Sequence, residues 1–345
     1  MAASAEYESR TAYEAIVNAF ESHQNLALEL EILPSAVAVP EGKLILQDGR
    51  CIGIPKKVLV HAFIRARGLF FKCSSHRSGT REALVATKIM LLFDPEHITA
   101  ANYRKKHLLG LQTSHTGRVD KEVSEAVREE CRLLDSILTS PLHRQTKSPT
   151  LWSHRRWLVS TFYQFLRDSR YSGTQDGEKS IELAEFRSVF QAGERHPNNY
   201  YAWRYARDLV ALVGCRSDGI ASSDRATSIR SLTEAVLSWC LSHPSDVSGW
   251  SFLSFVLQRP EQDRDNSQNV LSKVISFALD LRLAHESLWV FIRTVLAIDS
   301  VLPKTLRIED VRKIRCCVAE EGERASAFTE KVRTALSYIE KLSSI

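Results

Sequence analysis

Apolar side chains recur every three or four residues along most of the chain from Gly79 onward, a spacing that places them on one face of an α-helix. Prolines interrupt this pattern repeatedly, at Pro95, Pro149, Pro197 and Pro244. The residue before a proline leaves the helical region, whereas proline itself suits the first turn of a helix. The sequence therefore predicts pairs of helices joined by short turns that contain proline.

The predicted helices form five pairs and a terminal stretch. The first pair begins with 80–93 and continues around Ala101. The remaining pairs and the last stretch are predicted over 122–139 and 149–167, 179–195 and 198–213, 226–242 and 246–258, 268–283 and 285–299, and 308–342. The last stretch is expected to cover the exposed face of the final pair, which repeat arrays require at their ends.

The first 80 residues follow a different pattern. Residues 7–24 are amphipathic at helical spacing and predict a first helix. Residues 26–80 contain short apolar runs divided by prolines and glycines, which favours extended or turn structure over long helices. The predicted organisation is thus an irregular N-terminal head over 1–80, five helical hairpins over 81–300 and capping helices over 301–345.

A short motif repeats within this array. Trp heads the second helix of four pairs, and alanine takes its place in the first pair: Ala101, Trp152, Trp203, Trp250 and Trp289. The intervals between these positions are 51, 51, 47 and 39 residues. A nearly regular period of this length is typical of a solenoid of stacked helical hairpins. The fold class predicted is all-α, an alpha-alpha superhelix with a small irregular head.

The indoles and the arginines that follow them have different expected roles. Each Trp is expected to pack against a neighbouring helix. The arginines are Arg155, Arg156, Arg207 and Arg293. Two interpretations of them remain open, because a guanidinium group donates several hydrogen bonds at fixed angles. They could bridge to carboxylates or carbonyl groups of the adjacent hairpin, or they could line the concave face that meets a partner.

Composition narrows the class of protein. Of the 345 residues, 44% are hydrophobic and 25% are charged, and the net charge is only +5, so no nucleic-acid partner is expected. Seven scattered cysteines without a Cys-x-x-Cys pair indicate reduced thiols. No secretory signal and no membrane span is expected, which together predict a cytoplasmic protein.

The sequence contains no recognisable motif for catalysis or metal binding. There is no Gly-rich phosphate loop, no His-Glu-x-x-His and no metal-ligand cluster, so no metal site and no self-sufficient active site is predicted. Two basic clusters remain, one over 65–81 and one over 104–107. Each is interpreted as a solvated face, with contact to a diphosphate or an acidic surface as the alternative.

The sequence around two of the tryptophans resembles a known repeat. Asn199-Tyr200-Tyr201-Ala202-Trp203, and then residues 149–156, are similar to the Asn-Tyr-x-x-Trp-x-x-Arg-Arg repeat of protein prenyltransferase alpha subunits. The resemblance covers about residues 85–299. Residues 29–34 and 48–57 look like the N-terminal segment of the divergent repeat-containing alpha-type members of that family.

The resemblance implies a heterodimer in which a crescent of hairpins wraps a separate beta subunit. The beta subunit would carry the zinc, most of the isoprenoid pocket and the substrate thiolate, and no cofactor would be bound by this chain. The alpha-type chain would support transfer of an isoprenoid, expected to be geranylgeranyl, to a cysteine of a protein substrate. The prenyl diphosphate and the protein substrate would reach this chain only through the complex.

The same resemblance nominates a few polar residues near the diphosphate. In the family, a lysine lies five residues before Trp in a Lys-Asn-Tyr-x-x-Trp run. Lys147 has that position before Trp152, but Asn198 replaces the lysine before Trp203. Asn199, Tyr200 and Tyr201 are the candidate binding residues. Either Lys147 serves the reaction, or the chain is a scaffold. The alternative function is a non-catalytic helical-repeat adaptor that binds another protein.

Overall fold

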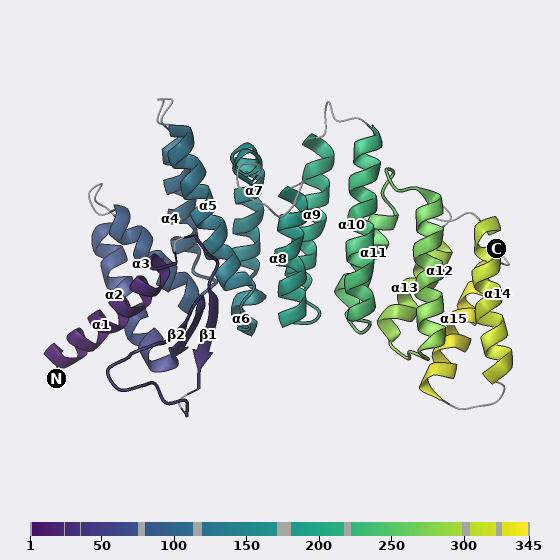
Figure 1. Ribbon diagram of the computed structural model, residues 1–345, viewed down its shortest axis with the longest axis horizontal. Helices are drawn as coiled ribbons and strands as arrows, with labels where there is room; N and C mark the ends of the chain where they lie inside the picture. The colour runs from purple at the N-terminus through teal and green to yellow at the C-terminus, as the bar shows by residue number, and fades with distance from the viewer. Residues whose placement is uncertain are drawn as a thin grey trace. The chain divides into compact units, whose positions relative to one another are not determined.

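A computed structural model describes residues 2–23, 25–34, 36–74, 80–112, 119–170, 181–216, 222–298, 304–321 and 326–343 of the chain (Figure 1). The described residues are mainly helical, with a small sheet near the N-terminus. The chain divides into two compact units, residues 1–209 and residues 210–345. This division falls within a helix, whereas the boundaries predicted near residues 80 and 300 follow changes in the sequence pattern. The predicted fold class, an all-α array of hairpins with a small head, is confirmed.

The head of the first unit contains two helices and three short strands within the described residues. Their bounds are α1 (Ala2–Glu21), β1 (Glu29–Leu33), β2 (Leu46–Asp48), β3 (Cys51–Pro55) and α2 (Lys56–Cys73). The strand order is β1-β3-β2, with β1 parallel and β2 antiparallel to β3. Leu30, Ile52 and Ile54 alternate with more exposed residues and bury one face of this sheet. The backbone N–H of Leu28 donates to Ser136 Oγ at 2.7 Å, which attaches the start of β1 to the helical array.

The prediction of an irregular segment over 26–80 is wrong for its second half. Residues 56–73 form one continuous helix, α2. Its buried side chains Leu59, Ala62, Ala66 and Phe70 are spaced by three, four and four residues, which is helical spacing. The short apolar runs and the preceding Pro55 obscured this pattern, because proline stands directly before the helix and not within it.

Three hairpins begin in the first unit, and the last helix of the third continues past residue 209. They are α3 (Thr80–Phe93) with α4 (Ile98–Gln112), α5 (Val119–Leu138) with α7 (Pro149–Arg170), and α8 (Ile181–Arg195) with α9 (Tyr200–Arg216). A four-residue helix, α6 (His143–Thr146), lies in the turn between α5 and α7. The predicted start near Gly79 lies outside the described residues.

The second unit repeats the same arrangement. Its helices are α10 (Ser222–Ser242) with α11 (Val247–Leu257), α12 (Arg264–Asp280) with α13 (Glu286–Ala297), and α14 (Lys304–Glu321) with α15 (Ala327–Ser343). The terminal stretch predicted over 308–342 as capping helices is a hairpin of two helices. Here α14 packs against α12 and α15 packs against α13, so the terminal pair continues the stacking of the earlier pairs. Phe328 of α15 lies with its ring centroid 6.2 Å from that of Trp289.

Candidate functional site: the repeat contacts and the second-helix face

The four repeat tryptophans are buried, and the indoles of Trp152, Trp250 and Trp289 close the turn of their own hairpin. Trp203 and Trp289 are completely buried, and Trp152 and Trp250 are nearly so. Where the indole hydrogen bond is resolved, Nε1 donates to the carbonyl oxygen six residues earlier. These bonds are Trp152 to Thr146 at 2.8 Å, Trp250 to Pro244 at 3.0 Å and Trp289 to Leu283 at 2.7 Å. An indole buried in this way keeps its one donor satisfied while its rings fill the core.

The carbonyl six residues before the Trp position also accepts a hydrogen bond from the next hairpin. Three contacts of this kind join successive hairpins: Ser148 Oγ to Pro95 O at 3.1 Å, Asn199 Nδ2 to Thr146 O at 3.1 Å and Ser287 Oγ to Pro244 O at 2.7 Å. Pro95 has the same position relative to Ala101 as Thr146 has relative to Trp152. The turns of neighbouring hairpins are thus connected at equivalent places within each unit.

In four of the five repeats the residue four positions before the Trp position also caps its own helix, whereas His285, four before Trp289, makes no side-chain cap bond. In each cap the side-chain atom accepts a hydrogen bond of 2.8 to 3.3 Å from the backbone N–H three residues later. The pairs are His97 Nδ1 with Ala100, Ser148 Oγ with Leu151, Asn199 Oδ1 with Ala202 and Asp246 Oδ1 with Gly249. Such caps satisfy one of the free N–H groups of the first helical turn. Apart from Asn199, these residues were not singled out from the sequence. A constant offset of four residues before the Trp position would have revealed them.

These contacts locate the predicted binding residues. Asn199 is completely buried, and both ends of its amide are used within the chain. Tyr200 is 61% exposed and Tyr201 is 38% exposed, with their rings edge to face at 5.4 Å. The structure therefore places Asn199 in the packing between hairpins and the two tyrosines at the surface of α9.

The two residues at the position of the family lysine differ in their backbone. Lys147 ends α6, and its Nζ donates to the carbonyl oxygen of Pro197 at 3.2 Å. Asn198 is exposed and has φ of 58°, in the left-handed region. Asparagine tolerates this conformation better than lysine does. The geometry of the turn therefore explains why asparagine stands at position 198.

Arg155 is a buried link between three helices. Its Nε lies 2.6 Å from Glu185 Oε2 of α8, and its Nη1 lies 2.6 Å from Asp135 Oδ1 of α5. Its Nη2 donates to Ser188 Oγ at 3.2 Å. Although burial alone would lower its pKa, the carboxylates of Asp135 and Glu185 raise the pKa of Arg155 well above its ordinary value. Tyr205 of α9 donates to the same Glu185 oxygen at 2.8 Å.

Arg104 makes the equivalent link one hairpin earlier. It lies three residues after Ala101, as Arg155 lies three residues after Trp152. Its Nε donates to both oxygens of Glu130 of α5 at 2.9 Å, and its Nη1 donates to Thr87 Oγ1 of α3 at 2.9 Å. Each of these arginines thus connects the first helix of its own hairpin to the first helix of the next. Ala206 has this position in α9 and makes no such link.

Glu130 is held as a carboxylate in the core. His154 Nε2 lies 3.1 Å from Glu130 Oε1, and both side chains are buried. Burial raises the pKa of Glu130, but the opposing effects of the Arg104 charge and the His154 hydrogen bond lower it far below the ordinary value.

The other motif arginines are closer to solvent. Arg156 is 61% exposed at its side chain, and its Nη1 lies 3.3 Å from Asp208 Oδ2. Arg293 Nη2 lies 3.0 Å from Glu286 Oε1. Arg207 Nη1 donates to the carbonyl oxygen of Trp203 at 3.3 Å. The structure thus separates the adjacent pair: Arg155 bridges hairpins, whereas Arg156 lies on the exposed face of α7.

The two predicted basic clusters do not form single patches. Arg65 lies 4.0 Å from Glu6 of α1, and Arg67 covers the ring of Phe71 at 5.4 Å. Arg77 lies outside the described residues. In the second cluster Arg104 is buried, while Lys105 covers the ring of Trp157 of α7 at 5.4 Å.

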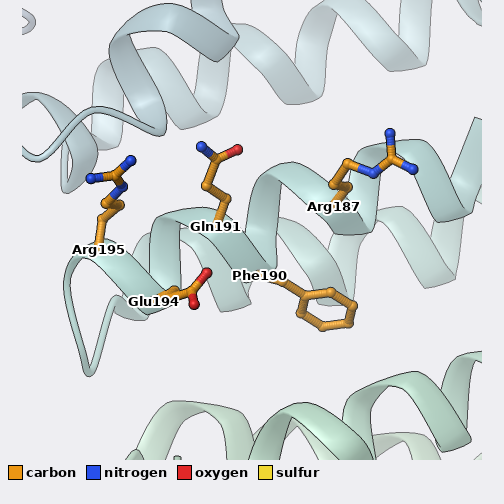
Figure 2. Close-up of a pocket in the computed structure, with 5 residues that line it drawn as sticks. All are labelled: Arg187, Phe190, Gln191, Glu194 and Arg195. Atoms are coloured by element: carbon orange, nitrogen blue, oxygen red, sulfur yellow. The ribbon is translucent and has the colours of Figure 1, made fainter. Parts of the chain in front are cut away.

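A hollow of about 530 Å³ lies along α8 (Figure 2). Its lining residues are Arg187, Phe190, Gln191, Glu194 and Arg195. Figure 2 shows Arg187, Gln191 and Arg195 extending to one side of the helix and Phe190 to the other. Arg195 Nη2 also lies 3.6 Å from Glu29 of β1. None of the predicted binding residues lines this hollow, and its mixed charge indicates no single ligand.

Neither a metal site nor a membrane-spanning helix is found among the described residues. No group of three or more His, Cys, Asp or Glu side chains within them is placed to hold a metal ion. No helix among those residues has the length and apolar character needed to cross a membrane.

The fold and the contacts in register define the class of this protein as an all-α helical-hairpin repeat protein. Residues 151–279 match the family model described as ECM9 middle domain. The chain is 25% identical over 196 residues to protein prenyltransferase alpha subunit repeat-containing protein 1-B of Xenopus laevis, covering 54% of this chain and 40% of that protein. It is 24% identical over 264 residues to protein prenyltransferase alpha subunit repeat-containing protein 1 of Homo sapiens, covering 70% of this chain and 56% of that protein.

A further relative carries the name of an enzyme subunit. The chain is 24% identical over 150 residues to geranylgeranyl transferase type-2 subunit alpha of Candida albicans, covering 43% of this chain and 36% of that protein. The chain spans between 36% and 56% of the length of these three relatives. The resemblance found in the sequence is confirmed: the chain is similar to proteins named for prenyltransferase alpha subunit repeats.

Proposed function

We propose that this chain is the alpha-type subunit of a heterodimeric protein prenyltransferase and supports the transfer of a geranylgeranyl group to a cysteine of a protein substrate. The observation that carries the proposal is the set of Trp and turn contacts in register, in a chain similar to a geranylgeranyl transferase subunit alpha. Tyr200 and Tyr201 are the predicted binding residues that are open to a partner.

In this proposal the chain acts as a scaffold. Zinc held by the beta subunit would stabilise the thiolate of the substrate cysteine, which is the nucleophile of the transfer. The residues of this chain would hold their hairpins at fixed spacing and present their second helices to the partner. Asn199 and Arg155 would serve this purpose from within the fold, because their polar atoms are used inside the chain.

Lys147 supports a scaffold more than a catalytic role. Its ammonium group donates to Pro197 O and connects the turn before α7 with the turn before α9. A lysine that stabilised a leaving diphosphate would have to give up this contact. Asn198 at the second lysine position has no positive charge to offer.

The same two observations favour the second candidate function, a non-catalytic adaptor that binds another protein through the hairpins. The adaptor and the enzyme subunit share the scaffold and differ in whether the bound partner is a prenyltransferase beta subunit. An obligate subunit gains stability from its partner by mass action, whereas an adaptor folds without it.

We place the protein in the cytoplasm. Cys51, Cys73, Cys240, Cys316 and Cys317 are free cysteines, and free thiols persist in reducing compartments. Imaging of the tagged full chain checks this, and a secreted or luminal location would contradict it.

The function is tested by co-expression with prenyltransferase beta subunits of the same organism, followed by an assay of labelled geranylgeranyl transfer to a cysteine-bearing protein. We expect a co-purified heterodimer with transfer activity. Lys147→Ala should lower kcat by less than about threefold, like the neighbouring control Arg144→Ala, whereas loss of an essential transition-state contact costs about 100-fold. Co-purification without transfer would favour the adaptor, and the absence of any complex would end the proposal.

A further inference from the structure

The second helices of the first unit present an unusually cationic face. We define the second-helix stripe as the exposed or half-buried basic residues of α4, α7 and α9 whose side chains are described. They are Lys105, Lys106, Arg156, Arg204 and Arg207. On the described parts of these helices, Asp208 is the acidic residue that reaches the surface beside them. The stripe therefore carries a clear excess of positive charge.

This excess is not shared by the first helices of the same hairpins. The exposed or half-buried charges described on α3, α5 and α8 comprise seven basic and six acidic residues. The second helices of the other unit also differ: the places equivalent to Arg156 are Ser254 in α11 and Arg293 in α13, and Arg293 is paired with Glu286. The excess of positive charge is thus concentrated on the second helices of the first unit.

Side-chain contacts make the stripe continuous from one helix to the next. Lys105 of α4 covers the ring of Trp157 of α7 at 5.4 Å. Arg156 of α7 lies 3.3 Å from Asp208 of α9. Arg204 lies 3.7 Å from the same carboxylate, which therefore orients guanidinium groups from two helices.

Three basic residues of the stripe also occupy the same position in successive repeats. Lys105, Arg156 and Arg207 each lie four residues after the Trp position of their repeat. Packed helices are separated by about 8–10 Å. An extended polypeptide advances by about 3.3 Å per residue, so it would bring every third residue to successive helices. A ligand that matches the stripe therefore carries a negative charge at about every third residue.

We propose that the second-helix stripe binds an extended acidic segment of a partner protein, with Asp or Glu at about every third residue. The segment would run across α4, α7 and α9. The half-buried Trp157, which Lys105 covers and which follows Arg156 in the chain, offers it an apolar contact.

The spacing of charge favours a polypeptide over a nucleic acid. One strand of a nucleic acid presents a phosphate about every 3.4 Å, roughly three times as often as the stripe presents a helix. The carboxylate of Asp208 also lies within the stripe and would repel closely spaced phosphates. The net charge of the whole chain, +5, is low for a nucleic-acid-binding protein.

This inference does not depend on prenyl transfer. It concerns the recognition of a polypeptide by this chain alone, so a failure of the transferase proposal would leave it standing. Likewise, transferase activity without acidic-peptide binding would remove only this inference.

The test measures binding of fluorescent 15-residue peptides to the full chain by anisotropy at two salt concentrations. One peptide has Glu at every third position, and a second has the same composition with its Glu residues clustered at one end. A single-stranded RNA homopolymer is the third probe. Lys106→Gln with Arg156→Gln removes two charges from the stripe, and Arg81→Gln with Lys121→Gln removes two exposed charges from the first helices as a matched control.

We expect the spaced peptide to bind more tightly than the clustered peptide and the RNA, and to bind more weakly as salt rises. The stripe variant should weaken binding by up to about 25-fold, since each of its two exposed ion pairs contributes at most about fivefold. The control variant should bind as the unchanged chain does. Lys106→Gln alone, which alters an exposed residue, gives the same direction should the double variant fold poorly, and thermal melting monitors folding.

Several results would overturn the proposal. They are equal binding of the two peptides, equal weakening by the stripe and control variants, tighter binding of the RNA at physiological salt, and no binding of the spaced peptide.

Discussion

Arg155 Nε lies 2.6 Å from Glu185 Oε2, and both side chains are completely buried although 30 residues separate them in the chain. The contact joins α7 to the first helix of the following hairpin. Because Asp135 binds the same guanidinium group from α5, one arginine fixes the positions of three helices. The stacking of hairpins thus depends on a few buried polar links as well as on apolar packing.

Removing this link should strongly destabilise the first unit. Arg155→Ala leaves Glu185 buried without its cation, and breaking a buried ion pair in this way costs about 3–5 kcal/mol of unfolding free energy. The neighbouring Arg156→Ala alters an exposed pair and should cost less than about 1 kcal/mol. Urea unfolding of both variants measures the difference, and similar losses in the two would contradict the assigned roles.

The turn before α9 allows a second comparison between adjacent residues. Asn199→Ala removes the helix cap and the bond to Thr146 O, with an expected cost of about 1–2 kcal/mol. Asn198→Gly should leave stability nearly unchanged, because glycine adopts the left-handed conformation freely. Asn198→Lys, which restores the lysine of the family motif, should cost about 1 kcal/mol of backbone strain. An Asn198→Lys variant as stable as the unchanged chain would show that the backbone conformation of the turn does not determine the residue at position 198.

The low pKa of Glu130 predicts a specific loss of stability in acid. Its folded pKa is lowered by Arg104 and His154, against the effect of burial, so the unfolded chain binds the proton more readily. The contribution of this carboxylate is present above its unfolded pKa and declines as pH falls below about 5. Unfolding free energies at pH 7 and pH 4 should differ less in Glu130→Gln than in the unchanged chain. An equal difference in both proteins would refute the prediction.

Gly249 is required by the close approach of another helix. A methyl group at this position would lie 2.6 Å from Cζ3 of Trp239 and 3.3 Å from Cys240 Sγ. Trp239 is stacked against His243 at 4.2 Å and cannot withdraw without losing that contact. Gly249→Ala should therefore cost about 1–3 kcal/mol.

Gly110 of α4 is the matched control for Gly249. It has open space around it, and alanine favours a helix by up to about 1 kcal/mol over glycine. Gly110→Ala should raise the melting temperature slightly, whereas Gly249→Ala should lower it. Should both substitutions act in the same direction, the close contact at Gly249 would not be limiting.

The sequence predicted the helical array well because its signals are local. Apolar spacing and prolines mark each helix, and the repeated Trp positions identify equivalent places in successive hairpins. The burial of Trp203 and Trp289 follows from the same pattern. These features can be predicted without knowing which segments of the chain contact each other in the folded protein.

The features that escaped prediction depend on contacts between distant segments. The bond from Ser148 to Pro95 O spans 53 residues, and nothing local to either residue indicates the other. The helix over 56–73 was obscured because its apolar residues adjoin Pro55 and resemble the short runs before it. The positive φ of Asn198 is likewise a property of the folded turn and explains a departure from the family motif that the sequence could only record.

The most direct test of the central claim is the mass of the particle formed when this 39.0 kDa chain is co-expressed with prenyltransferase beta subunits and analysed by light scattering after gel filtration. We predict a stable complex of one alpha-type chain with one beta subunit. A chain that elutes alone at 39.0 kDa in the presence of every beta subunit of its organism would contradict the claim.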